Sequence, residues 1–520
     1  MKRFIAIFLL LALFLAGCAA SDDPYIPTGD GLTWDEDYTG PAVTRPVEEE
    51  EQNLTLAYYP QVTMNPYTCN DFTNRALFSL IYQGLFSVDR NYNVTPVLCS
   101  RYTMSQSMTT YTFYIDEKAT FSDGTPVRAE DVVASLQEAK KYRYYGSRFS
   151  KMGSVSLSDD GGVRIVMNTA YENLPLLLDV PIVKAAEVEL ENPLGSGPYV
   201  LSTTSVSAQL TRRTNWWCNS SLVVTAPYIR LVAAESTNHI RDEFQFGDLD
   251  LVQADPGSDN YADYRSDYEL WESESGVFLF LACNLESGAF TSATLRTALT
   301  YAIDRESIAK EYYRGFARAA SLPASPLCPY YNQALAGRYD YDPQLFAKAV
   351  ADTGMTDRAV TLLVNSEDSL RLRVARAIAE MLEAGGLKVT LKDSSSDDYY
   401  YSLSHGNYDL YLGQTKLSPN MDLSHFFSTS GNLNYGGISD VTTYTLCQQA
   451  LENHGNYYTL HQNIMENGLL CPVVFRSYAV YATRGLLTKL TPSRDNVFYY
   501  SIGKSMEEAY IVPQPKQTEE

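Results

Sequence analysis

Strand-like and helix-like segments alternate along this chain, as α/β lobes require. Thr110–Asp116 alternates along a β-rich stretch and predicts a strand. Ser122–Pro126 has the residues of a tight turn, and Val132, Leu136 and Ala139 then recur on one face of a helix. A chain of 520 residues is longer than one hydrophobic core usually supports. We therefore expect two or more α/β lobes.

Acidic residues surround that turn and raise the question of a metal loop or a catalytic pair. Asp123 is placed to accept hydrogen bonds from nearby backbone amides. Glu130 and Asp131 fall in the first turn of the predicted helix, where negative charge favours the helix dipole. A metal site needs more converging ligands than this stretch supplies, so we interpret all three acids as structural.

The N-terminus predicts export. A basic start precedes the apolar run Phe4–Ala16, which is shorter than the ~20 residues of a spanning helix, so residues 1–17 predict a signal peptide. The run ends in Leu15-Ala16-Gly17-Cys18, the pattern of a bacterial lipobox, and Cys18 is the predicted lipidation site. We expect a protein anchored by lipid to the outer face of the bacterial cytoplasmic membrane, or facing the periplasm. The alternative is a plain secretory signal with an accidental cysteine.

Acidic composition marks both the next segment and the whole chain. Residues 18–52 are rich in Gly, Pro, Asp and Thr and end in Glu48–Glu51, which predicts a flexible tether. The formal net charge is -22, and a surface that negative repels phosphates. We therefore predict no nucleic-acid partner.

Enzyme and metal motifs are absent from the sequence. It contains no GxSxG elbow and no HExxH among its five histidines. Gly503-Lys504-Ser505 resembles the end of a P-loop, but Phe498 stands where the first glycine belongs. Seven cysteines follow Cys18, an odd number with no CxxC pair, so we infer no disulfide framework. We predict no catalytic residue, no metal and no cofactor.

Several segments, in order along the chain, resemble the family 5 extracellular solute-binding proteins of ABC importers. They include "NPYTCNDFTNRALFSLIYQGLFSVD", "FSDGTPVRAEDVVASL", "GSGPYVL", "RRTNWW" with "APYIRLV" and "FQFGDLDLV", and "LRTALTYAIDRESIAKEYYRGFARAA". The last, Leu295–Ala320, is the most specific. The best-known members of this family bind oligopeptides and dipeptides.

The resemblance implies a fold and its domain boundaries. The fold is α/β, a two-lobed periplasmic-binding-protein clamp (type II, cluster C-like) with a mixed sheet in each lobe and an extra subdomain inserted in lobe I. The strands that cross between lobes would be "GVFLFLACN" and "CPVVFRSYAVYATR". The implied boundaries are residues 53–68, 194–276 and 475–512 for lobe I, 69–193 for the inserted subdomain, 277–474 for lobe II, and 513–520 for a tail.

The resemblance also implies function. A ligand enters between the lobes, the lobes close by hinge motion, and the closed form, expected to be a monomer, docks on the permease and ATPase of an importer. In peptide-binding relatives the ligand lies extended and pairs with protein backbone as an added strand. The partner is therefore expected to be a peptide. Alternatives are another small solute, such as an oligosaccharide, an opine or a metal chelate, or a role as a surface hydrolase.

The candidate ligand residues are those whose positions match the family's cleft. Peptide binders carry Trp-x-Ala-Asp at the stretch that reads Thr415–Ser418 here, so Ser418 replaces the acid that neutralises the ligand amine. Either Asp422 takes over that role, or the ligand has no ammonium there, as in an anionic or capped peptide. Asp422 is alternatively a helix N-cap, and Tyr59 and Gln253 are alternatively ordinary loop residues. The predicted ligand-binding residues are Tyr59, Gln61, Gln253, Thr415, Lys416, Leu417 and Asp422.

Overall fold

The structure is a computed structural model that describes residues 53–204, 207–218, 222, 224–258, 264, 267–487, 490–494 and 496–499. The predicted signal peptide, Cys18, the tether and the tail lie outside the described residues. Within these ranges, no helix combines the length and apolarity needed to cross a membrane.

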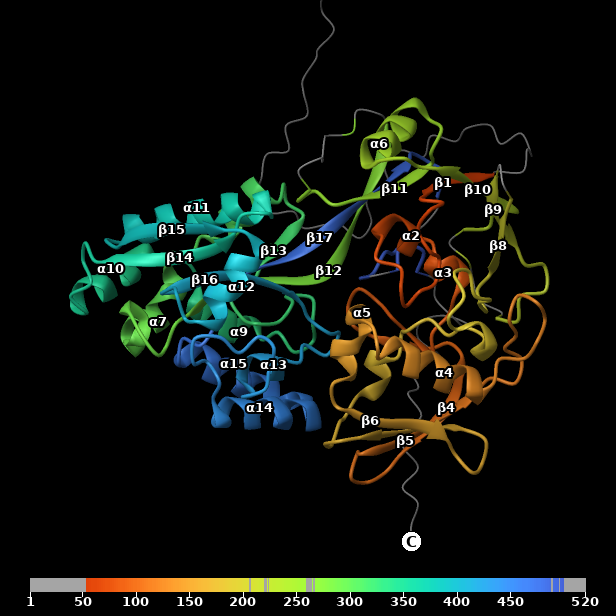
Figure 1. The fold of residues 1–520 in the computed structure, drawn as a ribbon, viewed down its shortest axis with the longest axis horizontal. Helices are drawn as coiled ribbons and strands as arrows, with labels where there is room; N and C mark the ends of the chain where they lie inside the picture. Colours follow the sequence, from red (N-terminus) through yellow and green to blue (C-terminus); the bar gives the residue numbers. More distant parts are fainter. Residues whose placement is uncertain are drawn as a thin grey trace, which may run out of the picture. The chain divides into compact units, whose positions relative to one another are not determined.

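One mixed sheet of eleven strands organises the fold (Figure 1). Its strand order is β15 (Lys388–Ser394), β14 (Ala359–Asn365), β16 (Leu410–Lys416), β12 (Tyr268–Cys283), β17 (Cys471–Thr483), β11 (Leu251–Ala254), β1 (Leu54–Tyr58), β10 (Tyr228–Ala233), β9 (Ala208–Arg212) and β8 (Tyr199–Thr203), and β13 (Ala317–Ala319) pairs with β17.

The long antiparallel pair β12 and β17 runs from one half of the sheet to the other (Figure 1). These are the two strands that the sequence predicted to cross. We call the half with β1 and β8–β11 lobe I, and the half with β13–β16 lobe II. The pairing shifts register between Glu274 and Val277, where Gly276 has a φ of 71°. The segment boundaries expected from the resemblance stay a prediction.

Lobe I buries its sheet between two apolar cores. Helix α6 (Thr237–Phe246) covers one face through Ile240 and Phe244. It starts because the Ser236 side chain accepts a hydrogen bond from the backbone of His239, and it ends at Gly247 in the left-handed conformation. The opposite face packs against the inserted segment through Leu54, Leu56 and other strand residues.

Lobe II also has a core on each face of its strands. One core contains side chains of α7 (Ala293–Ala298), α10 (Pro343–Asp352) and α11 (Ser369–Ala384). The other contains side chains of α12 (Ser396–Ser404), α13 (Ser424–Phe427), α14 (Val441–Glu452) and α15 (Tyr457–Glu466). Shorter helices are α8 (Arg305–Ser307), α9 (Gln333–Ala336), the π-helix Ile308–Tyr312, and the 3₁₀ turns Ala289–Thr291, Leu299–Ala302, Gly337–Tyr339 and His454–Asn456.

The inserted segment forms a subdomain with its own antiparallel sheet. Its strands are ordered β4 (Cys99–Met104), β5 (Thr110–Ile115), β7 (Val163–Met167) and β6 (Met152–Leu157), beside a hairpin of β2 (Phe86–Val88) and β3 (Val94–Pro96). Its helices are α2 (Phe72–Ala76), α3 (Phe78–Ile81), α4 (Ala129–Ala139) and α5 (Arg143–Gly146), with 3₁₀ turns at Ser147–Phe149, Leu174–Leu177 and Ala185–Glu187.

The acids around the predicted turn have structural roles, as the sequence indicated. The strand before the turn is β5 and the helix after it is α4. Asp123 accepts hydrogen bonds from the backbone of Thr125 at 2.9 Å and from Lys184 Nζ at 2.6 Å. Asp131 accepts from the backbone amides of Arg128 and Ala185, each at 2.8 Å. Both carboxylates therefore hold the corner to the following chain.

The glycines of "GSGPYVL" are explained by a close backbone approach. A Cβ atom on Gly195 would lie 2.1 Å from the Ile81 carbonyl oxygen, and one on Gly197 would lie 2.5 Å from the Ile81 carbonyl carbon. Only glycine lets the entry to β8 pack directly on the end of α3.

Candidate functional site

A row of polar side chains lies on one face of the sheet where β12 and β17 cross between the lobes. Arg476 pairs with Val277, which also pairs with Lys416, and Gln253 pairs with Val480. Because side chains alternate along a strand and paired residues share a face, Lys416, Arg476, Tyr478 and Gln253 lie on the same face. Each is half-buried. We call this the crossing face.

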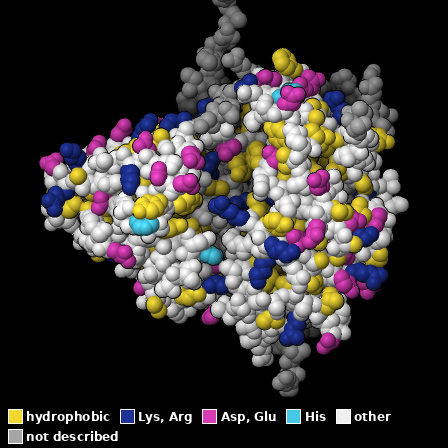
Figure 2. Space-filling model, in the orientation of Figure 1, with side chains coloured by type: hydrophobic (Ala, Val, Ile, Leu, Met, Phe, Trp, Pro, Cys, Tyr) yellow, Lys and Arg dark blue, Asp and Glu magenta, His cyan; other side chains and the backbone are white. Residues whose placement is uncertain are grey.

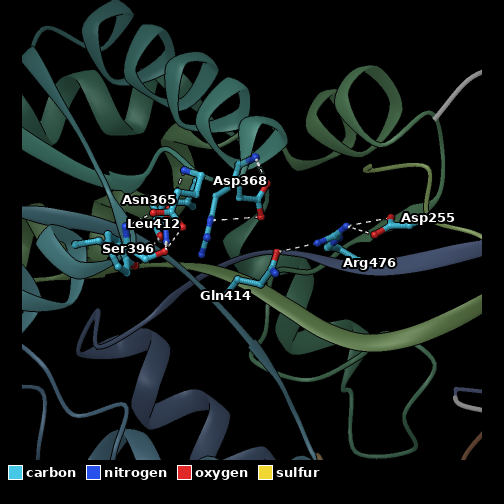
Figure 3. A network of polar contacts seen from close by, with 10 residues as sticks. Asp255, Asn365, Asp368, Ser396, Leu412, Gln414 and Arg476 are labelled. Carbon is cyan, nitrogen blue, oxygen red and sulfur yellow. Dashed lines mark hydrogen bonds and ion pairs between the residues drawn. The ribbon is translucent and has the colours of Figure 1, made fainter. Parts of the chain in front are cut away.

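An ion pair and a hydrogen bond, both made by Arg476, join three elements at the crossing face (Figure 3). Nη2 of Arg476, on β17, lies 3.0 Å from both carboxylate oxygens of Asp255, which follows β11. Its Nη1 donates to Oε1 of Gln414, on β16, at 3.1 Å. Burial alone would lower the pKa of Arg476, but the charge of Asp255, with Tyr313 and Asp368, raises it. Arg476 therefore keeps its positive charge, and its ion pair links a lobe I loop to lobe II.

Tyr478 lies beside this ion pair with its hydroxyl available. Its ring centroid is 4.9 Å from that of Phe72, the first residue of α2. No hydrogen bond joins its hydroxyl to any described residue. Burial raises the pKa of Tyr478 to about 12, with the cations Lys416 and Arg476 acting in the opposite direction. The hydroxyl is therefore neutral at physiological pH and able to donate to a ligand.

Two cations contact one tyrosine next to this ion pair. Lys416 Nζ donates to the Tyr144 hydroxyl at 2.9 Å and lies 4.5 Å from its ring centroid. The Arg75 guanidinium lies 3.4 Å from the same ring centroid. Tyr144 belongs to α5, so Lys416 connects lobe II to the inserted subdomain. Figure 2 shows Lys and Arg side chains gathered in the middle of the face viewed.

The strand that carries Lys416 has an open edge. β16 pairs with β14 only through Leu410 and Tyr411, and the Leu412 carbonyl accepts from the Tyr399 hydroxyl at 3.0 Å. From Gly413 to Thr415 the strand pairs with β12 on one side and with no described strand on the other. Backbone groups alternate in direction along a strand, so some of these amides and carbonyls point to the open edge.

The structure brings together two of the predicted ligand residues, Gln253 and Lys416, on the crossing face. Thr415 pairs with Phe278 and so lies on the opposite face of the sheet. Leu417 is buried, and its backbone amide donates to the Gly276 carbonyl at 3.0 Å.

The predicted residues after β1 occupy a turn that positions α2. The Tyr59 backbone amide donates to Asn74 Oδ1 at 2.8 Å, and Asn74 Nδ2 donates to the carbonyls of Tyr59 and Val62. The Tyr59 ring packs on the α6 side of lobe I, while Gln61 is exposed. This turn holds α2, which places Phe72 against Tyr478.

Asp422 lies in a packed turn instead of on the crossing face. Its Oδ1 accepts from the Ser424 amide at 2.8 Å, one residue before the N-cap of α13, which is Leu423. Its charge contributes to raising the pKa of the buried Tyr171 and Tyr457, after the larger effect of burial. Ser418 in turn donates to Asn420 Oδ1 at 2.6 Å. A ligand contact of Asp422 stays a prediction.

Sequence reasoning missed Asp255, Gln414, Arg476, Tyr478 and Tyr144. The return strand did carry a signal, because Arg476 and Tyr478 interrupt an apolar run at alternate positions. Arg476 and Asp255 are far apart in the chain, and only the fold brings them together as an ion pair.

The opposite face of the crossing strands carries a second polar cluster, which is buried. Glu274 accepts hydrogen bonds from the Tyr92 hydroxyl and from Ser325 Oγ, the latter at 2.6 Å. Arg494 donates to the Leu417 carbonyl at 3.1 Å and contacts the Tyr92 hydroxyl. Burial raises the pKa of the Glu274 carboxyl. This cluster joins the inserted subdomain, β12, lobe II and the C-terminal segment.

Metal-ligating side chains do not converge in the part of the chain that the structure describes. No group of three or more His, Cys, Asp or Glu side chains is placed there to hold a metal ion. Each of the seven cysteines after Cys18 is a buried thiol.

Comparisons with known proteins agree with this architecture. A family model described as bacterial extracellular solute-binding proteins, family 5 middle, matches residues 93–435. The glutathione-binding protein GsiB of Escherichia coli is 25% identical over 350 residues, which cover 64% of this chain and 68% of GsiB.

Solved structures share the fold. The oligopeptide-binding protein AppA of Bacillus subtilis, solved with a nonapeptide, superposes with a TM-score of 0.59 at 19% identity, covering 87% of this chain and 99% of AppA. NikA of Brucella suis, solved with Fe(III)-EDTA, gives a TM-score of 0.68 at 19% identity, covering 87% of this chain and 100% of NikA. The expected two-lobed periplasmic-binding fold is confirmed. By its family match over residues 93–435, the chain belongs to the bacterial extracellular solute-binding proteins of family 5.

Proposed function

We propose that this chain captures a short peptide between its lobes and delivers it to an ABC importer. The observation that carries the peptide assignment is the open edge of β16 at Gly413–Thr415, which lies next to the crossing face. An extended peptide can add to such an edge as a strand, with main-chain hydrogen bonds that do not depend on the peptide's sequence.

The crossing face provides side-chain contacts for the same ligand. The Tyr478 hydroxyl has no partner among the described residues, and the Phe72 ring beside it offers apolar surface. Lys416 and Arg476 supply positive charge, while Asp255 supplies negative charge. A zwitterionic peptide has both charges to match, in addition to its backbone groups.

Two relatives support a peptide ligand. GsiB binds glutathione, by its name, and glutathione is a tripeptide derivative. AppA of Bacillus subtilis was solved with a nonapeptide. Each of these ligands belongs to the relative itself. Together they support a peptide as the class of ligand, and they do not give its length.

Capture requires the lobes to open and close. β12 and β17 form the long connection between them, and Gly276 sits at the register shift within it. The Asp255–Arg476–Gln414 contact bridges a lobe I loop to lobe II across this connection. A small hinge with a polar bridge beside it suits ligand-dependent closure. The proposal includes the lipid anchor at Cys18, the tether over residues 18–52, and a monomeric protein outside the cytoplasmic membrane.

A second candidate ligand is a carboxylate-rich metal chelate. The observation that favours it is that two cations, Lys416 and Arg75, both contact the Tyr144 ring. NikA of Brucella suis, with the same fold, was solved with Fe(III)-EDTA.

Calorimetry on the full-length protein tests the proposal. Tri-alanine, glutathione, a pool of mixed tripeptides, Fe(III)-EDTA and a pool of oligosaccharides are titrated separately. Saturable binding confined to the peptides supports the assignment. Binding confined to the chelate or to the sugars contradicts it. Ligand recovered chemically unaltered after incubation argues against a hydrolase.

A further inference from the structure

A second contact, apart from the crossing strands, joins the inserted subdomain to lobe II. The Glu172 backbone amide donates to the carbonyl of Leu451, in the last turn of α14, at 2.9 Å. Oε2 of Glu172 accepts from the His454 backbone amide at 2.8 Å and lies 3.6 Å from Nδ1 of the same histidine. We call this contact, between residues 171–176 and residues 451–456, the clasp.

Apolar side chains interlock at the clasp. Leu451 of lobe II is 1% exposed and belongs to the core that the inserted subdomain shares with lobe I. Leu176 of the inserted subdomain is fully buried and belongs to the lobe II core beside α12–α15. Asn420 of lobe II donates to the hydroxyl of the buried Tyr171. Because each leucine fills space in the opposite part, the clasp removes apolar surface from water.

The clasp must separate if the lobes are to open. The inserted subdomain packs on one face of the lobe I sheet through a shared apolar core, so it moves with lobe I. Lobe II can then swing away only when its own contacts with the subdomain break, which include the bond from Lys416 to Tyr144 at 2.9 Å. The buried Glu274 lies two residues before Gly276, at the proposed hinge, where displacement is small.

The composition of the clasp suits a reversible contact. The Glu172 side chain is 45% exposed, and Lys151, which donates to the Tyr444 hydroxyl of α14 at 3.2 Å, is half-buried. Both side chains can return to water when the two parts separate. The two leucines add apolar surface whose exposure costs far less than opening a whole core. The Tyr111 hydroxyl donates to the Glu172 carbonyl at 3.1 Å, which holds this segment on its own subdomain.

We propose that the clasp forms when the lobes close on a ligand and slows release of that ligand, with Glu172 as a positioning residue that does not contact the ligand. The inference rests on the proposed peptide function and deepens it, because it assigns the contact that holds the closed form. A contact present only in the closed form stabilises the bound state, so its loss acts on the dissociation rate.

Hydrogen exchange of single backbone amides tests when the clasp forms. The amides of Glu172 and His454 donate across it, so they exchange slowly only while it is intact. In the full-length protein, saturation with tri-alanine is expected to slow both by roughly tenfold or more. The His239 amide, which bonds to Ser236 within lobe I, is the matched control and should not change. Equal exchange of the clasp amides with and without peptide would overturn the inference.

Variants of Glu172 test its effect on release. Glu172→Ala should speed dissociation of tri-alanine roughly threefold to tenfold, in stopped-flow measurements, and leave association within about twofold. Glu172→Gln keeps an acceptor oxygen and should retain part of the slow release. Glu117→Ala removes an exposed glutamate of the same subdomain and should change neither rate. Thermal melts without ligand show whether each variant is folded.

The outcomes separate this inference from the function on which it rests. Unchanged dissociation of tri-alanine from Glu172→Ala overturns the clasp, and peptide capture stands because binding is retained. Wild type that binds neither tri-alanine, glutathione nor the mixed tripeptides contradicts the proposed function, and the inference falls with it.

Discussion

The two faces of the crossing strands carry similar residues for different purposes. Each face has a tyrosine, an arginine and a carboxylate: Tyr478, Arg476 and Asp255 on the crossing face, and Tyr92, Arg494 and Glu274 opposite. Tyr478 is half-buried with no hydrogen-bond partner for its hydroxyl among the described residues, whereas Tyr92 is buried and donates to Glu274.

This difference separates residues that are available to a ligand from residues that hold the parts of the fold together. A hydroxyl that is unpaired and reachable costs little to remove from the protein but can bond to a ligand. A buried hydroxyl that satisfies a buried carboxylate is expensive to remove, because the carboxylate is left desolvated without its donor. Substitutions on the buried face should therefore change stability, and those on the crossing face should change affinity.

The largest expected effect is Glu274→Ala. It removes the carboxylate from a fully buried cluster and leaves Arg494 without its nearby negative charge. We expect a loss of about 3 to 5 kcal/mol in the free energy of unfolding, measured by urea titration. Glu380→Ala, on the exposed side of α11, is the matched control and should change stability by less than about 0.5 kcal/mol. Equal effects of the two variants would contradict a structural role for the buried cluster.

The paired variants Tyr92→Phe and Tyr478→Phe test the comparison directly. Tyr92→Phe should cost about 1 to 3 kcal/mol of stability, because Glu274 loses a donor. Tyr478→Phe should leave stability unchanged and weaken peptide binding by about 1 kcal/mol, close to fivefold. Thermal melts and calorimetric titration measure the two quantities. Stability loss in Tyr478→Phe without loss of affinity would remove it from the ligand site.

Gly276→Ala examines the proposed hinge between the two lobes. Gly276 has a φ of 71°, and an added Cβ would lie 2.9 to 3.1 Å from the Arg494 guanidinium. The left-handed backbone alone costs an alanine about 1 to 2 kcal/mol. Gly124→Ala is a matched control, because Gly124 has a φ of 83° with no atom within 4 Å of the added Cβ. Any destabilisation of Gly276→Ala beyond that of the control, in urea titrations, reports crowding against Arg494; no difference would indicate that Arg494 moves freely.

A pH titration tests whether a histidine in the core next to the buried face is neutral. His461, beside Tyr457, is fully buried, and neither of its ring nitrogens has a partner among the described residues; burial lowers its pKa to about 3. Below about pH 6.5 this histidine is protonated in the unfolded chain but stays neutral in the folded chain. The free energy of unfolding therefore falls as the pH drops from about 6.5 towards 3.

The variant His461→Leu removes this linkage. On acidification, the variant should lose less stability than wild type. The difference in the free energy of unfolding should be on the order of 1 kcal/mol for each pH unit below about 6.5. Urea titrations at pH 7.5 and 5.5 measure the difference. Parallel pH profiles for the two proteins would show that His461 is not neutral and buried.

Much of the fold, and less of the site, could be predicted from the sequence. β5, α4 and the crossing strands β12 and β17 follow from local periodicity and from family motifs, because they depend on residues close together in the chain. Lys416 and Gln253 were expected by analogy, and both reach the crossing face.

The remaining site residues depend on contacts that no local pattern records. Tyr144 meets Lys416 across 272 residues of chain, and Asp255 meets Arg476 across 221. Thr415, next to Lys416, lies on the other face because side chains alternate along β16. The family's amine-pairing position is occupied by Ser418, so analogy pointed to Asp422, which lies in a turn beside buried tyrosines.

The most direct measurement is a crystal structure of the protein with a bound peptide. We expect an extended ligand whose backbone pairs with Gly413–Thr415 on the open edge of β16 and whose side chains and terminal groups contact Tyr478 and Lys416. A ligand bound elsewhere, with Gly413–Thr415 and Tyr478 free of contact, would contradict it.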